Sequence, residues 1–93
     1  MPKRIMIVDD HLDIVNLITG ILTSNGYETL HAYTGDETLR KLYETQVDMV
    51  LLDVMLPGEF DGWRTLMEIK KLSPYRNVPV IMITAKQPSF DML

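Results

Sequence analysis

The 93-residue chain contains no cysteine, which excludes disulfide bonds and thiolate metal sites. Its nine lysines and arginines are scattered and are outnumbered by thirteen aspartates and glutamates, which gives a formal net charge of -4. This distribution argues against a surface that coats nucleic acid. Stability must therefore come from packing, and we expect no direct binding of nucleic acid by this segment.

Long apolar stretches are also missing from the sequence, since no segment approaches the ~20 apolar residues of a membrane span. The basic start MPKR precedes an apolar run that two aspartates cut short, unlike the core of about 7–15 residues in a secretory signal. Neither a P-loop nor a glycine-rich dinucleotide turn occurs. We expect one small cytoplasmic domain over residues 1–93, without membrane contact.

What the sequence does contain is a repeated alternation of short apolar runs with segments of helical spacing. Continuous apolar runs are typical of strands covered on both faces, and their alternation with helices favours an open, doubly wound α/β sheet with parallel strands. The run at 27–32 is weak and is expected at an edge of the sheet. The predicted strands are 5–8, 27–32, 49–53 and 78–84, and the predicted helices are 12–25, 35–44 and 63–72.

Acidic side chains follow two of these apolar runs. In open parallel sheets, ligands bind beyond the carboxyl ends of the strands, so the residues that end each run are candidates for a site. Asp9 and Asp10 follow the first strand, Asp53 ends the third, and Thr84 and Ala85 end the fourth. We expect three carboxylates and a hydroxyl to converge on one edge of the sheet.

Crowded carboxylates repel one another unless a cation neutralises them. Because the available ligands are oxygens and the histidines are not suitably spaced, Mg²⁺ or Mn²⁺ is preferred over zinc. A carboxylate beside such an ion can act as a nucleophile on a phosphoryl donor and form an aspartyl phosphate.

Each of these residues also has a plain structural interpretation. Asp9 and Asp10 suit the start of any helix, Asp53 suits a loop after a buried strand, and threonine is common at strand ends. His11 is expected to face solvent, and His31 is expected to be structural. The functional interpretation depends on the conjunction of the acidic residues with the strand pattern.

Three motifs together carry a family resemblance: IMIVDD, LLDVMLPG about forty residues later, and VPVIMITA about thirty further on. In order, spacing and strand context the chain resembles the receiver domains of two-component response regulators. The resemblance implies a flavodoxin-like sheet of order 2-1-3-4-5. It also implies a set of site residues: Asp53 as phosphoacceptor, Asp9 and Asp10 on Mg²⁺ directly or through water, the Met55 backbone carbonyl as a third ligand, Thr84 as switch hydroxyl and the Ala85 N–H on the phosphate.

The implied function is a phosphoacceptor in a two-component phosphorelay, with a sensor histidine kinase or phosphotransfer protein as partner. Its chemistry is limited to Mg²⁺-dependent self-phosphorylation and slow autodephosphorylation, so the chain is not expected to be a conventional enzyme. The pair Asp61-Gly62 resembles the family's aspartate-glycine before the third helix, which we interpret as loop geometry.

The chain departs from the family pattern at its end, where a fifth strand that begins with a lysine and a last helix are expected but not present. We therefore expect a C-terminally incomplete domain, foremost a fragment of a longer protein, with an unpaired edge at the fourth strand. A homodimer or segment exchange could complete it. Two alternatives stay open: a phosphorylation-incompetent interaction module, and a haloacid-dehalogenase-like phosphatase, in which Met55 stands where a second aspartate is required.

Overall fold

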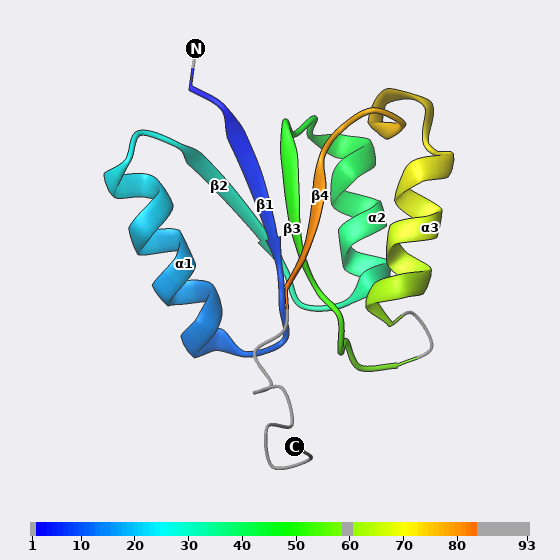
Figure 1. Ribbon diagram of the computed structural model, residues 1–93, viewed down its shortest axis with the longest axis horizontal. Helices are drawn as coiled ribbons and strands as arrows, with labels where there is room; N and C mark the ends of the chain where they lie inside the picture. Colours follow the sequence, from blue (N-terminus) through cyan, green and yellow to red (C-terminus); the bar gives the residue numbers. More distant parts are fainter. Residues whose placement is uncertain (1, 59–60, 84–93) are drawn as a thin grey trace, which may run out of the picture.

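The structure is a computed structural model that describes residues 2–58 and 61–83. Within them a four-stranded parallel sheet in the order β2-β1-β3-β4 lies between two layers of helices (Figure 1). One helix, α1, covers one face, and α2 and α3 cover the other. This confirms the predicted flavodoxin-like order 2-1-3-4. The elements are β1 (Arg4–Val8), α1 (Leu12–Ser24), β2 (Glu28–Ala32), α2 (Gly35–Glu44), β3 (Met49–Asp53), α3 (Gly62–Lys71), the 3₁₀ helix η1 (Ser73–Tyr75) and β4 (Val80–Ile83).

The two central strands form the centre of the core, because their apolar runs, residues 5–8 and 49–52, present apolar side chains to both faces of the sheet. Met6 pairs with Val50 and Val8 with Leu52, and these four side chains are fully buried on the face that packs against α2 and α3. The side chains of β1 alternate between the faces of the sheet, so Ile7 lies on the opposite face, the one that α1 covers. The second strand lies at an edge, as predicted.

A glycine ends α1, and side-chain hydrogen bonds cap the start of α2. The first helix stops where Gly26 adopts a φ of +89°, a conformation that favours glycine, and its N–H donates to the Thr23 carbonyl at 3.1 Å. Thr34 caps the start of the second helix, and its hydroxyl accepts from the Glu37 N–H at 3.1 Å. The Glu37 carboxylate reaches back to the Tyr33 N–H at 2.7 Å. This reciprocal arrangement is close to a capping box.

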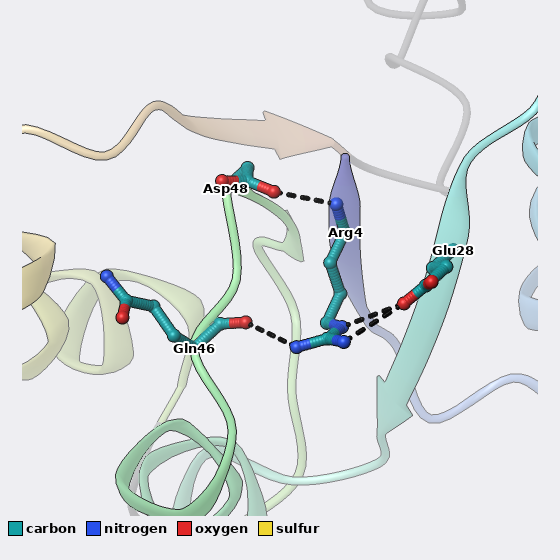
Figure 2. A network of polar contacts seen from close by, with 4 residues as sticks. All are labelled: Arg4, Glu28, Gln46 and Asp48. Carbon is teal, nitrogen blue, oxygen red and sulfur yellow. Dashed lines mark hydrogen bonds and ion pairs between the residues drawn. The ribbon is translucent and has the colours of Figure 1, made fainter. Parts of the chain in front are cut away.

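At the amino edge of the sheet, Arg4 joins three strand starts (Figure 2). Its guanidinium donates to the Glu28 carboxylate, with N···O distances of 3.0 and 3.1 Å, and to the Gln46 carbonyl at 3.1 Å. The backbone N–H of Arg4 donates to the Asp48 carboxylate at 2.8 Å. These contacts, which we call the Arg4 clamp, fix β1, β2 and β3 relative to one another.

The segment between α3 and β4 contains one element that the sequence pattern did not predict, the 3₁₀ helix η1. It places Tyr75 in the core, where its hydroxyl donates to the carbonyl of Leu42 at 2.8 Å and contacts that of Thr45 at 3.1 Å. The fourth strand starts at Val80 and not at residue 78, because Pro79 has no N–H to donate to a neighbouring strand. None of the helices in the described ranges is long and apolar enough to cross a bilayer.

Candidate functional site

The carboxyl ends of β1 and β3 lie side by side and bring together the three predicted acidic residues. Val8 pairs with Leu52, so Asp9 and Asp53 leave neighbouring strands at the same edge, and both side chains are almost completely buried. Asp10 follows with a partly exposed side chain. One ligand atom from each of Asp9, Asp10, Asp53 and also His11 lies within 4.8 Å of the others. We call these four residues the acidic cluster.

His11 occupies a position that the sequence interpretation missed. Its backbone N–H donates to Asp9 Oδ1 at 2.8 Å, which closes a tight turn just before α1. The ring Nδ1 then lies 3.0 Å from Asp9 Oδ1 and 3.2 Å from Asp10 Oδ1. The side chain is 58% exposed, as expected, but its nitrogen faces the carboxylates. The His11 ring is thus exposed, as predicted, and one of its nitrogens borders the acidic side chains, which the spacing of the histidines does not indicate.

Burial and charge perturb the titration of two members of the cluster. Burial raises the pKa of Asp53, and the nearby carboxylates of Asp9 and Asp10 raise it further. The Met55 N–H, which donates to Asp53 Oδ1 at 3.1 Å, opposes this shift, as does His11. The hydrogen bond to Asp9 raises the pKa of His11, and the negative charge of Asp10 adds to that increase. The cluster thus concentrates negative charge that one imidazole only partly offsets.

One oxygen of the cluster, Asp9 Oδ2, is buried and has no hydrogen-bond partner among residues 2–58 and 61–83. Burying a carboxylate oxygen without a partner or counter-ion is costly, so such an atom points to a cation. The donors are three carboxylates and one imidazole at the open edge of the sheet, and this set fits a divalent ion. The residues present therefore fit the predicted metal site.

The floor of the site is held by the start of α3. Asp61 caps this helix by accepting from the Arg64 N–H at 2.8 Å, and the Gly62 N–H donates to the Val54 carbonyl at 3.1 Å. A Cβ atom at Gly62 would lie 2.3 Å from the Asp53 carbonyl oxygen. The sequence predicts a loop role for Asp61 and Gly62 but does not predict this close approach of Gly62 to Asp53. The aspartate-glycine pair before a helix is the sequence signal from which the approach could be inferred.

The remaining predicted site residues have different outcomes. Met55 lies two residues after Asp53, and its backbone N–H donates to Asp53 Oδ1. The role of the Met55 backbone carbonyl as a metal ligand stays a prediction. Thr84 and Ala85, the predicted switch hydroxyl and phosphate contact, lie outside the described residues. Ile83, the last described residue, pairs with Asp53 across β3 and β4.

Comparison with known proteins bears directly on this site. Residues 5–93 match the response regulator receiver domain family. The N-terminal domain of a response regulator receiver protein from Methanoculleus marisnigri is similar, with 40% identity and a TM-score of 0.83 over 95% of this chain and 71% of that one.

Two further solved structures are also similar. The chemotaxis protein CheY4 of Vibrio cholerae has 25% identity and a TM-score of 0.88, over 99% of this chain and 76% of that one. A putative response regulator from Chloroflexus aurantiacus has 29% identity and a TM-score of 0.88, over 96% of this chain and 72% of that one. The family match and the similarity of fold therefore agree with each other.

Proposed function

This chain belongs to the family of response regulator receiver domains, and on that premise we propose that Asp53 is its phosphoacceptor. The phosphoryl group comes from a sensor histidine kinase or a phosphotransfer protein in the cytoplasm, and the reaction requires Mg²⁺. The single observation that carries this proposal is the convergence of Asp9, Asp10 and Asp53 at the carboxyl edge of the sheet.

The proposed roles of the acidic residues and Met55 are those that membership of the receiver family implies. Asp9 and Asp10 hold the ion directly or through water, together with Asp53 and the backbone carbonyl of Met55. The bound ion supplies positive charge that offsets the negative charge of the incoming phosphoryl group. The Met55 N–H, which donates to Asp53 Oδ1, orients the acceptor carboxylate so that its other oxygen is directed to the donor.

In the transfer step, an Asp53 carboxylate oxygen attacks phosphorus, and a P–O bond to Asp53 forms as the P–N bond of the donor phosphohistidine breaks. The electron pair of the broken bond stays on the donor imidazole, which takes up a proton. While Asp53 is phosphorylated, Thr84 acts as the switch hydroxyl that moves to hydrogen-bond the phosphoryl group, with the Ala85 N–H as a further donor, and this movement of Thr84 changes the signalling surface. Water later hydrolyses the acyl phosphate slowly and ends the signal.

The test is intact mass spectrometry of the chain after incubation with acetyl phosphate and Mg²⁺. We expect a mass gain of one phosphoryl group that disappears in Asp53→Asn and in excess chelator. Asp48→Asn is the matched control, because Asp48 lies at the opposite edge of the sheet, where its carboxylate accepts from the Arg4 N–H. Unchanged phosphorylation of a folded Asp53→Asn variant would overturn the assignment.

A second candidate function, association with a second copy of the chain, is favoured by exposed apolar side chains. The contacts of α1 with the sheet are to β1 and β2, which leaves the same face of β4 without a described covering helix. Ile81 of β4 is 47% exposed, and Leu17 and Ile21 of α1 are 60% and 54% exposed. Contact between such side chains of two copies would remove apolar surface from water.

Sedimentation equilibrium separates this second function from the first. We expect a concentration-dependent dimer in which Ile81→Lys lowers association, while Met67→Lys, on an exposed apolar residue of α3, does not. A monomer at all concentrations that still accepts phosphate supports the phosphoacceptor function alone. A dimer that accepts no phosphate supports an interaction module.

A further inference from the structure

The ring of His11 is exposed on one side, and its Nδ1 borders the acidic cluster. Its Nδ1 is held 3.0 Å from Asp9 Oδ1 and 3.2 Å from Asp10 Oδ1, two atoms that belong to the cluster. The backbone of His11 is fixed by the hydrogen bond of its N–H to Asp9 Oδ1. The turn therefore places the Cα of His11 beside the carboxylates, within reach of its ring.

The four donor atoms have nearly the spacing of a single coordination shell. In an octahedral site with ligand distances of about 2.1 Å, opposite ligands lie roughly 4.2 Å apart. The donors of Asp9, Asp10, His11 and Asp53 all lie within 4.8 Å of one another. A small inward movement of these side chains would place three oxygens and one nitrogen around one ion.

A second observation indicates that positive charge is needed beside Asp9. Among the described residues, Asp9 Oδ2 is buried and has no hydrogen-bond partner, whereas Asp9 Oδ1 already accepts from the backbone N–H of His11. That backbone hydrogen bond is kept when the ring nitrogen gives up its own contact with Asp9 Oδ1 to bind an ion, and Asp9 Oδ2 needs positive charge. A ligand set with this unpartnered oxygen and an adjacent imidazole suits one shared metal ion.

We propose that His11 is a nitrogen ligand and that the site therefore binds a first-row transition-metal dication, such as Mn²⁺ or Co²⁺, in preference to Mg²⁺. Mg²⁺ prefers an all-oxygen shell, while imidazole is a good ligand for transition metals, whose affinities rise from Mn²⁺ to Co²⁺ along the series. This inference rests on the metal site of the proposed function and deepens it, because it specifies which ion the site selects.

Isothermal titration calorimetry with Mg²⁺, Mn²⁺ and Co²⁺ measures the selectivity. We expect wild type to bind Co²⁺ more tightly than Mg²⁺, and His11→Gln to reduce that preference about tenfold or more. The affinity for Mg²⁺ should change much less. His31→Gln is the matched control, because His31 is the other of the two histidines and lies outside the cluster.

Pulsed electron paramagnetic resonance of bound Mn²⁺ supplies a readout that does not depend on affinity. We expect a coupling to ¹⁴N of an imidazole in wild type and in His31→Gln, and its loss in His11→Gln and His11→Asn. Circular dichroism checks that the variants fold. No nitrogen coupling in wild type, or a selectivity that His11→Gln leaves unchanged, overturns the proposal and leaves His11 as a hydrogen-bond partner of the carboxylates.

Phosphorylation with acetyl phosphate and Mg²⁺ separates this result from the proposed function. Wild type that is phosphorylated at Asp53 and also shows a Co²⁺ preference that depends on His11 supports both proposals. Phosphorylation of wild type without any transition-metal preference contradicts the His11 role alone. Tight, His11-dependent binding of Co²⁺ without phosphorylation of Asp53 contradicts the phosphoacceptor function alone.

Discussion

Gly62 approaches Asp53 so closely that a Cβ atom at Gly62 would lie 2.3 Å from the Asp53 carbonyl oxygen. The same Cβ would lie 2.7 Å from the Cα of Val54. Both contacts are with backbone, which cannot rotate away as a side chain could. The start of α3 thus packs directly against the backbone at the end of β3, although Gly62 itself has no group that reacts.

Gly62→Ala is therefore expected to destabilise the fold by about 1–3 kcal/mol and to slow phosphorylation of Asp53. Urea unfolding measures the first effect, and the rate of mass gain with acetyl phosphate measures the second. Gly20→Ala, in the interior of α1, is the matched control, because a Cβ atom at Gly20 would meet nothing within 4 Å beyond its own helix backbone. That change should stabilise the protein by about 0.5–1 kcal/mol. Equal stability of Gly62→Ala and wild type would contradict the steric argument.

Tyr75→Phe should lower the free energy of unfolding by roughly 1–2 kcal/mol, because at least one buried carbonyl then lacks a donor. The variant removes the hydroxyl that binds the carbonyls of Leu42 and Thr45. Tyr43→Phe is the control, since Tyr43 lies beside Leu42 on α2 and is 78% exposed, and it should change stability little. Chemical denaturation of both variants tests the difference, and equal effects would contradict it.

Glu37 should make the stability of α2 dependent on pH. The hydrogen bond from the Tyr33 N–H lowers the pKa of Glu37 below its ordinary value of 4.5, and Lys41 lowers it further. A carboxyl group with a lowered pKa in the folded state stabilises the protein above its ordinary pKa, and this contribution is lost as the pH falls through the lowered value.

Glu37→Gln is accordingly expected to be about 1 kcal/mol less stable than wild type at neutral pH, with the difference shrinking below about pH 4.5. Thermal unfolding between pH 3 and 7 measures this trend in steps of roughly one pH unit. Glu44→Gln, exposed at the other end of α2, serves as control. A gap between Glu37→Gln and wild type that stays constant at all pH values would show that the carboxylate is not its source.

Asp9→Asn should remove the response of stability to metal. Because Asp9 Oδ2 is buried without a partner, neutralising Asp9 relieves repulsion with Asp10 and Asp53 when no ion is bound. In chelator we expect the variant to be as stable as wild type or up to ~1 kcal/mol more stable. Added Mg²⁺ should raise the melting temperature of wild type but not of Asp9→Asn, as differential scanning fluorimetry would record. An equal metal-induced rise in both proteins would exclude Asp9 as a ligand.

The sequence predicted the sheet well because its central strands are buried on both faces. Uninterrupted apolar runs mark β1 and β3 almost to the residue, and Gly26 marks the end of α1. The start of β4 was placed two residues early because the apolar run includes Val78, whose N–H instead donates to the Tyr75 carbonyl. Apolar character identifies a strand, but hydrogen-bond partners decide where it begins.

The same distinction applies to the site. The convergence of Asp9 and Asp53 followed from the rule that parallel strands end at one edge, since that rule depends only on topology. The position of the His11 ring beside Asp9 and Asp10 depends on the conformation of its own side chain, which a helix-start pattern does not encode. The helical pattern predicts only that His11 precedes the first helix and faces solvent.

The Arg4 clamp affects how the strands pair during folding. Parallel strands are never joined by a tight hairpin, so β1 must meet β3 across a long stretch of chain that includes two helices, a slow search with many misaligned pairings. A shift of β1 by one residue would separate the Arg4 guanidinium from Glu28 and turn Met6 from the core toward the opposite face. Misaligned intermediates therefore lose polar and apolar contacts together, which favours the native pairing over its nearest competitors.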